Sequence, residues 1–165
     1  MTLRAGVLSD THLIRPDSRF KRQIRHCFHD CDIIIHAGDI TEPTILEAFG
    51  NKSVYAVHGN MCSAKLHRQL PEATTFSFGN FTIGLTHGAR LGYDIEEHLW
   101  DLFPEVDCMI YGHTHRPAYH KIGQVLIINP GSFQATSRYG APGTYAILEA
   151  GETLVGTILE IPPSL

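Results

Sequence analysis

Five short apolar segments of this chain each end, within about three residues, in an aspartate, asparagine or histidine. In an open α/β sheet the carboxyl ends of the strands converge on one crevice, and ligands bind there. If the five segments are neighbouring strands, their polar residues meet in one place. The pattern therefore favours an α/β fold with a site at the strand ends. The residues concerned are Asp10, His12, Asp39, Asn60, His87, His113 and His115.

Helical patterns alternate with the first of these strands. The spacing of apolar residues predicts a helix over residues 17–31. Thr41 is expected to cap a second, short helix, and a third is expected over residues 64–70. Asp94, with Glu97 three residues on, resembles a capping box at the start of a fourth helix.

The second half of the chain is predicted to contain hairpins. Gly79-Asn80 is a predicted two-residue turn between two strands. Four further strand-like runs, separated by turn residues, predict an antiparallel meander over residues 118–161. Strands alternating with helices and followed by hairpins favour two mixed sheets packed face to face with helices outside. We expect residues 1–165 to form a single domain.

The composition excludes several classes of protein. Lys and Arg number 13 against 17 Asp and Glu, a formal charge of −4, whereas a protein that grips long nucleic acid usually presents a basic face. No apolar run approaches the roughly 18 to 20 residues of a membrane helix, and Met1 to Leu8 lacks the apolar segment of a cleavable signal. The four cysteines form no CxxC pair. We expect a cytoplasmic globular protein without a membrane or long nucleic acid as its partner.

Histidine is unusually frequent, with 11 in the chain, and the seven strand-end residues contain no cysteine. A single metal ion uses four to six ligands, so seven nitrogen and oxygen ligands fit two ions that share one carboxylate. This ligand mix suits Mn, Fe, Zn or Ni better than Ca or Mg. Taken alone, Asp10 is typical of a turn or a helix cap, and Asn60 of a turn. Their joint occurrence with the other ligand types favours a dinuclear metal site.

The remaining histidines are expected to have other roles. His36 lies inside a buried strand and is expected to be a core histidine with its hydrogen bonds satisfied. His120 is expected to be structural. Solvent-exposed positions on helices are expected for His26, His29, His67 and His98.

The order of the strand-end motifs resembles that of the calcineurin-like metallophosphoesterases, in particular their small, cap-less prokaryotic phosphodiesterase branch. The resemblance covers nearly the whole chain and includes a loop that this branch carries, Asn129-Pro130-Gly131-Ser132. It implies an α/β fold, a four-layer α/β/β/α sandwich of two mixed β-sheets flanked by helices. The motifs are Asp10-x-His12, Gly38-Asp39, Gly59-Asn60, His87-Gly88 and Gly112-His113-x-His115.

By this resemblance, one metal ion would be held by Asp10, His12, Asp39 and His115. The second would be held by Asp39, Asn60, His87 and His113, with Asp39 bridging. The implied cofactors are two divalent transition-metal ions, with Mn favoured and Ni, Zn or Fe as alternatives. A hydroxide between the ions would attack phosphorus in line while both ions neutralise the phosphate oxygens, so no serine or cysteine nucleophile is required. Asp39, Asn60 and His87 are the implied catalytic residues.

The sequence departs from the family directly after Asn60. Much of the family continues with His-Asp, in which the histidine serves as an acid near the leaving group, whereas Met61-Cys62 follows here. Methionine cannot donate a proton, and both residues are expected to pack under the site. General acid assistance is typically worth about 10²- to 10⁴-fold, so activated aryl phosphodiesters should be cleaved far better than alkyl monoesters. Candidate substrate contacts are His58 and Arg138, although for Arg138 a solvated surface position is favoured over an anion contact.

The favoured function is a metal-dependent phosphodiesterase that hydrolyses small or accessible phosphodiesters. A rival is a non-catalytic scaffold, because a family member in the retromer sorting coat serves mainly in protein assembly and also lacks the acid histidine. A nucleotide phosphomonoesterase or pyrophosphatase would share the same metals. A homodimer or tetramer is also expected, as is common among small family members.

Overall fold

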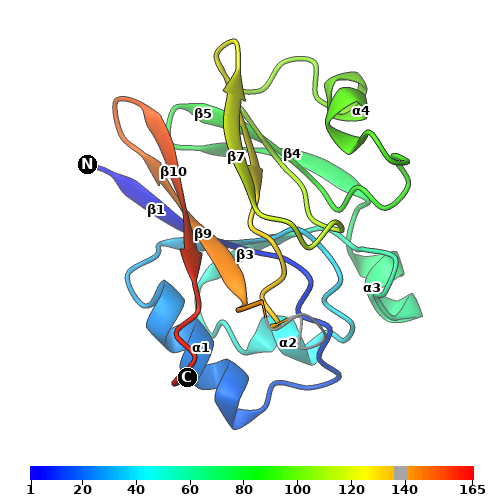
Figure 1. Cartoon of the computed structure of the whole chain (residues 1–165), viewed down its shortest axis with the longest axis vertical. Helices are drawn as coiled ribbons and strands as arrows, with labels where there is room; N and C mark the ends of the chain where they lie inside the picture. The colour runs from blue at the N-terminus through cyan, green and yellow to red at the C-terminus, as the bar shows by residue number, and fades with distance from the viewer. Residues whose placement is uncertain (136–140) are drawn as a thin grey trace.

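The computed structural model describes residues 1–135 and 141–165, which form two β-sheets packed face to face (Figure 1). The first sheet holds, in spatial order, β10 (Leu154–Glu160), β9 (Thr144–Ala150), β1 (Leu3–Leu8), β2 (Ile33–His36) and β3 (Ser53–Ala56). The second sheet holds β4 (Ala73–Phe78), β5 (Phe81–Thr86), β6 (Cys108–Ile110), β8 (Val125–Asn129) and β7 (Ala118–Ile122).

Each sheet has a parallel part and an antiparallel part. Strands β1, β2 and β3 pair in parallel, as do β5, β6 and β8. The antiparallel pairs are β1 with β9, β9 with β10, β4 with β5, and β7 with β8. Both sheets are therefore mixed, and within each sheet the parallel strands end at one edge.

The main core lies between the two sheets. Val7 and Ile35 of the first sheet and Leu85 and Ile110 of the second are fully buried in it. Burying such aliphatic side chains stabilises the fold by roughly 1.5 to 3 kcal/mol each. The alternation of side chains along the strands directs the other faces of the sheets towards the helices.

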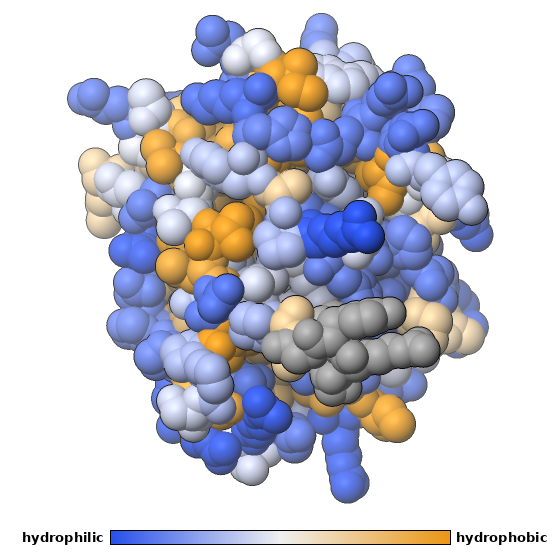
Figure 2. Space-filling model, in the orientation of Figure 1, coloured by the Kyte–Doolittle hydropathy of each residue, from blue (hydrophilic) through white to orange (hydrophobic). Residues whose placement is uncertain are grey.

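Helices cover both outer faces, which completes the predicted four-layer α/β/β/α sandwich (Figure 1). The face shown in Figure 2 is mostly hydrophilic, as expected when the apolar side chains are packed between layers. On the first sheet lie α1 (Ser18–Phe28), α2 (Thr44–Glu47) and α3 (Ala64–Gln69); on the second lies α4 (Ile95–Leu102). No helix in the described part of the chain is both long and apolar enough to span a bilayer.

The predicted helices are present, but two predicted caps are not. At α1 the side chain of Asp17 accepts a hydrogen bond from the Phe20 backbone N–H at 2.7 Å. The prediction that Thr41 caps α2 is wrong, because Pro43 occupies the N-cap position and Thr41 has a φ of 74°. Asp94 precedes α4 as predicted, but its side chain makes no capping hydrogen bond. Its backbone, with φ −98° and ψ 61°, departs from the extended conformation typical of a capping residue.

The predicted meander over residues 118–161 is also wrong. The structure has two separate hairpins, β7–β8 in the second sheet and β9–β10 in the first. The loop that begins at Pro130 carries the chain from one sheet to the other, since Phe133 N–H donates to the carbonyl of Ser9 at 2.9 Å, directly after β1. Proline cannot donate to a sheet ladder, which fits its place at the exit from β8.

Candidate metal centre

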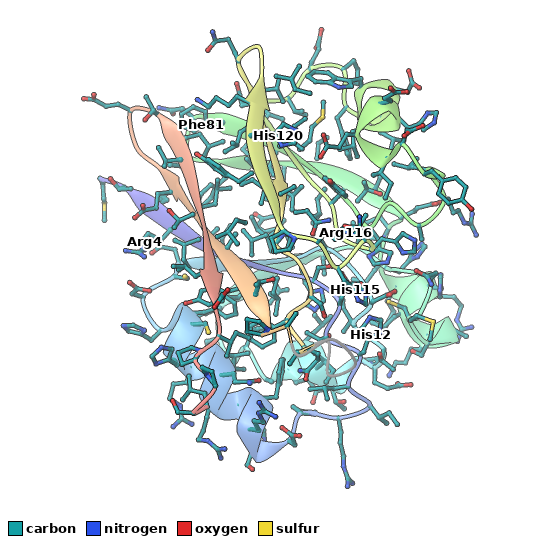
Figure 3. The ribbon with its side chains drawn as sticks, in the orientation of Figure 1. Arg4, His12, Phe81, His115, Arg116 and His120 are labelled. Atoms are coloured by element: carbon teal, nitrogen blue, oxygen red, sulfur yellow. The ribbon has the colours of Figure 1, made fainter. Side chains whose placement is uncertain are left out.

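The seven strand-end residues lie in the loops after β1, β2, β3, β5 and β6. Contacts between these loops bring residues of the two sheets together. His12, which follows β1, and His115, which follows β6, point towards one another in Figure 3, with 3.3 Å between their Nε2 atoms. The site is therefore built at the seam between the sheets, on the edge where the parallel strands end.

One cluster consists of Asp10, His12 and His115. Their ligand atoms all lie within 4.8 Å of one another. Oδ1 of Asp10 is 3.6 Å from Nε2 of His12 and 3.2 Å from Nε2 of His115. One carboxylate oxygen and two imidazole nitrogens thus converge on a single point, an arrangement that suits a divalent transition-metal ion.

A second cluster consists of Asp10, Asp39 and His87. Oδ2 of Asp39 lies 3.4 Å from Nε2 of His87 and 3.7 Å from Nε2 of His12, so this carboxylate of the second cluster also lies close to a histidine of the first. Oδ1 of Asn60 is 3.1 Å from Nε2 of His87. The ring of His113 packs edge-on against that of His87, with 5.2 Å between the centroids.

The carboxylate of Asp10 leaves one acceptor free for a cation. Its Oδ2 accepts hydrogen bonds from Ser9 Oγ at 2.6 Å and from the His113 backbone N–H at 3.2 Å. Its Oδ1 is buried and accepts no hydrogen bond from any residue in the described ranges. A buried oxygen without a donor costs free energy, and a metal ion at this point would remove that cost. The residues present therefore fit a bound divalent metal.

Backbone carbonyl and amide groups fix two of the ligand side chains. Nδ1 of His87 lies 2.7 Å from the carbonyl oxygen of Ala37. Because a carbonyl can only accept, Nδ1 of the neutral ring carries the proton, and the lone pair of Nε2 faces the carboxylates. This is the usual outer-sphere support of a metal-binding histidine. The Met61 backbone N–H donates to Oδ1 of Asp39 at 2.8 Å, which leaves Oδ2 directed at His87 and His12.

Several ligand residues have a positive φ angle, a backbone conformation that residues other than glycine rarely adopt. Such positive-φ positions cost on the order of 1 to 3 kcal/mol each and cluster at functional sites. In the described ranges six non-glycine residues have positive φ, and all but Thr41 are predicted ligands. These five are Asp10 (57°), His12 (47°), Asp39 (55°), His113 (66°) and His115 (59°).

Two glycines allow the close approach of these loops. Gly38 has a φ of 98°, and a Cβ atom there would lie 2.6 Å from Nδ1 of His87. A Cβ atom on Gly59 would collide with Oδ1 of Asp39. Any side chain at either position would displace a candidate ligand.

The electrostatics of the site favour ionised carboxylates. Burial acts to raise the pKa of Asp10, but the neighbouring imidazoles of His115 and His12 outweigh it and hold that pKa well below its usual range. Burial likewise acts to lower the pKa of His87, but contact with Asp39 leaves it raised. Contact with Asp10 raises the pKa of His115. The metal-free site thus stores negative charge that either protons or a metal ion can neutralise.

His36 is a buried core histidine, as predicted, and it also supports the site. Its Nδ1 accepts the Gly38 backbone N–H at 3.2 Å, so the proton of the neutral ring is on Nε2, 3.3 Å from Oγ1 of Thr11. The Thr11 hydroxyl in turn donates to the backbone carbonyl of Asp39 at 3.2 Å. Burial lowers the pKa of His36 to about 3, so this relay contains a neutral imidazole.

The last residue of β8 and the loop after it support the site with hydrogen bonds that no local sequence pattern predicts. Nδ2 of Asn129 donates to the carbonyl of Gly112 at 2.9 Å, just before His113. The single proton of Ser132 Oγ faces two carbonyl oxygens, that of Gln134 at 2.8 Å and that of Asp10 at 3.2 Å. The resemblance singled out this loop, but the hydrogen bonds depend on the spatial position of β8 beside β6.

The other predicted residues fall in different places. His58 lies beside the site, and Arg138 lies outside the described residues. The prediction that Met61 packs under the site is wrong: its side chain is 56% exposed, because its backbone N–H is the group that faces Asp39. Cys62 is packed as predicted, with its sulfur accepting the Gly59 N–H at 3.1 Å. Nε2 of His120 is hydrogen-bonded to Oε2 of Glu96 at 2.9 Å.

Residues 3–153 match the calcineurin-like phosphoesterase superfamily domain. The chain belongs to this superfamily. A probable metallophosphoesterase of Methanothermobacter thermautotrophicus is 32% identical over 157 residues, which cover 93% of this chain and 90% of the relative. A phosphodiesterase of Methanocaldococcus jannaschii is 27% identical over 147 residues, covering 78% and 83%.

The solved structure of Vacuolar Protein Sorting 29 from Cryptosporidium parvum shares the fold, with a TM-score of 0.81 and 20% identity over 99% of this chain and 94% of that one. As a calcineurin-like phosphoesterase, the chain is a hydrolase acting on phosphoric esters. The two clusters described above are its candidate ligands for divalent metal.

Proposed function

We propose that this calcineurin-like phosphoesterase is a dimetal-dependent phosphodiesterase that hydrolyses small or accessible phosphodiesters. The observation that carries the proposal is the pair of adjoining ligand clusters, which share Asp10 and enclose its unpaired Oδ1. Similarity to the Methanocaldococcus jannaschii phosphodiesterase supports a diester substrate.

Each ligand has a role within this proposal. Asp10, His12, Asp39 and His115 would hold one divalent ion, and Asp39, Asn60, His87 and His113 the other, with Mn favoured over Ni, Zn and Fe. When bound, such a metal pair supplies a water of lowered pKa and a positive field for the phosphate oxygens. The Asp39 carboxylate lies near a histidine of each cluster, and the Ala37 carbonyl keeps Nε2 of His87 turned towards it.

The absence of a proton donor at Met61 supports a preference for esters whose leaving group needs no protonation. Its exposed thioether cannot protonate a leaving oxygen, and the thiol of Cys62, whose sulfur accepts the Gly59 N–H, is only a weak hydrogen-bond donor. An activated aryl leaving group departs without protonation, whereas an alkoxide needs a proton. Activated aryl phosphodiesters should therefore be turned over far faster than alkyl phosphate monoesters, by a factor on the order of the 10²- to 10⁴-fold of general acid catalysis.

The test uses protein stripped of metal and reconstituted with Mn²⁺, Zn²⁺, Ni²⁺ or Mg²⁺. Hydrolysis of bis(p-nitrophenyl) phosphate and of p-nitrophenyl phosphate is followed for each metal, with an alkyl monoester as a third substrate. We expect metal-dependent turnover of the diester and a loss of more than about 100-fold in Asp39→Asn. Turnover that needs no metal, or equal turnover of aryl diester and alkyl monoester, would contradict the proposal.

A non-catalytic scaffold is the second candidate. The overall likeness to Vacuolar Protein Sorting 29 in fold and the methionine at position 61 are the observations in its favour. The same experiment separates the two functions. Protein that binds two metal ions yet hydrolyses none of the esters would support the scaffold and overturn the phosphodiesterase.

A further inference from the structure

A small cavity of about 190 Å³ adjoins the metal centre on the side of β3 and β5. It shares Asn60 and His87 with the centre, so a group bound in it would be next to a phosphorus atom at the metal site. Its other polar side chains come from the loop after β3, from α3, from the segment before β4 and from the loop after β5. They are His58, His67, Glu72 and Arg90.

Two imidazole rings form one wall of the cavity. The rings of His58 and His67 are tilted by 46°, with 4.2 Å between their centroids. The His58 backbone is fixed by a hydrogen bond from its N–H to the carbonyl of Pro71 at 3.0 Å. His67 is anchored on α3, whose N-terminus is capped by Ser63. Each ring offers an N–H donor even when it is neutral, so this wall can donate hydrogen bonds to an anion.

A guanidinium group adds a permanent positive charge. Nε of Arg90 lies 3.6 Å from Oε1 of Glu72, and the two side chains are 78% and 49% exposed. Such exposed ion pairs contribute little to stability, so Arg90 can exchange this partner at small cost. A guanidinium can bind a phosphate group, as it can a carboxylate, with two parallel hydrogen bonds.

We propose that the pocket formed by His58, His67 and Arg90 binds a second phosphate group on one ester arm of the substrate. This inference rests on the proposed phosphodiesterase activity and deepens it. The substrate class is then a phosphodiester whose arm carries a terminal phosphate, rather than a diester with two neutral arms. Glu72 acts as the competitor that the second phosphate displaces from Arg90.

The test compares two chromogenic diesters that differ only in the second phosphate. One is the p-nitrophenyl ester of thymidine 5′-phosphate, and the other is the same compound carrying a 3′-phosphate. With the Mn²⁺-loaded enzyme, KM should be at least about ten-fold lower for the phosphorylated compound, the size of effect that a charge-assisted hydrogen bond supplies. Equal KM values would overturn the inference, whereas metal-dependent turnover of both compounds would leave the phosphodiesterase proposal intact.

Variants of the pocket residues test whether the difference between the two KM values arises in the pocket. Arg90→Ala and His67→Ala should bring the ratio of the two KM values towards one. Glu72→Gln should increase the ratio, because it removes the competing carboxylate. Arg68→Ala on α3 and His98→Ala on α4 are matched controls outside the pocket and should leave the ratio unchanged. A ratio that responds equally to the controls would contradict the assignment.

A binding measurement on metal-free protein gives a readout independent of turnover. Thymidine 3′,5′-bisphosphate should bind more tightly than thymidine 5′-phosphate and should shift the NMR signals of the His67 ring, and Arg90→Ala should remove that difference. Inorganic phosphate is the third probe. If it saturates the His67 shifts while the two nucleotides bind equally well, the pocket is a free-phosphate site and the substrate inference is wrong.

Discussion

Oδ1 of Asp10 and Nε2 of His115 lie 3.2 Å apart, although the two residues follow strands of different sheets. The Asp10 oxygen is buried and accepts no hydrogen bond from the described residues. The residues at the seam between the sheets therefore present an oxygen and a nitrogen that a bound cation could contact together. Since five of the ligand residues also have strained positive-φ backbones, the fold maintains this geometry at a cost in stability.

The glycine beside the Asp39 carboxylate should be indispensable. In Gly59→Ala the new Cβ would collide with Oδ1 of Asp39, which must move away from His87 and His12. We expect metal affinity to fall by at least about ten-fold, with a loss of stability on the order of the 1 to 3 kcal/mol typical of an overpacked site. Calorimetric titration of Mn²⁺ and urea unfolding would measure the two effects. Gly151→Ala, remote from the site and with only the Thr2 side chain nearby, is the control and should keep the wild-type affinity.

The buried histidine beneath the site should make the metal-free protein sensitive to acid. The pKa of His36 is about 3 in the folded protein, against an ordinary value near 6.5. Between pH 6.5 and pH 3 this histidine takes up a proton in the unfolded chain but not in the folded one. The free energy of unfolding is therefore unaffected by His36 above pH 6.5 and decreases progressively as the pH falls towards 3. One proton changes the free energy of unfolding by about 1.4 kcal/mol per pH unit.

Urea unfolding of metal-free protein between pH 6.5 and pH 4.5 checks this prediction. His36→Asn, which keeps an acceptor for the Gly38 N–H, should show a shallower loss of stability across that interval. Burial also lowers the pKa of His58 and His113, so a residual slope of the same sign is expected. An unchanged slope in His36→Asn would show that the imidazole is not the group responsible.

Metal affinity should fall as the pH is lowered through neutrality. Coordination requires neutral imidazole, and the carboxylates raise the pKa values of His87 and His115 above the ordinary value in the metal-free protein. Protons therefore compete with the metal at a higher pH than they would at an isolated histidine. Titrations of Mn²⁺ at pH 8, 7 and 6 should give progressively weaker binding with release of protons. An affinity that is constant from pH 8 to pH 6 would argue against these two ligands.

A proton donor at position 61 should broaden the range of esters. The Met61 side chain is exposed beside the centre, so Met61→His can be accommodated without repacking the core. We expect the ratio of alkyl ester to activated aryl ester turnover to rise by about ten-fold or more, up to the full general-acid factor of 10² to 10⁴. Met61→Gln is a matched polar control that cannot serve as the acid. The same ratio in wild type, Met61→His and Met61→Gln would contradict the role assigned to this position.

Local sequence patterns predicted much of this fold. The apolar periodicity of α1 and the Gly79-Asn80 turn between β4 and β5 are properties of short segments, and both appear as expected. The partition of β8 and β9 between two sheets could not be predicted in this way. The sequence pattern of a hairpin is the same whether the next hairpin joins the same sheet or a different one. Which sheet it joins depends on packing between residues far apart in the sequence.

The candidate ligands were foreseeable because each follows a strand end, but the structure brings the seven residues together from two sheets and not from one. Their positive-φ backbone was not foreseeable, since aspartate and histidine ordinarily occupy other regions of backbone space. The relay from His36 through Thr11 to Asp39 also escaped prediction. It joins the last residue of β2 to residues in two separate loops, and the directions of these side chains are fixed only in the folded chain.

We expect this chain to hold two divalent ions at the seam between its sheets. The most direct test is the metal content of protein loaded with Mn²⁺ and dialysed, measured by mass spectrometry for wild type, Asp39→Asn and Asp10→Asn. Two ions per chain in the wild type, and a loss in both variants, are predicted. A wild-type chain that retains no metal, or variants that retain as much as the wild type, would show that these residues do not form a two-metal site.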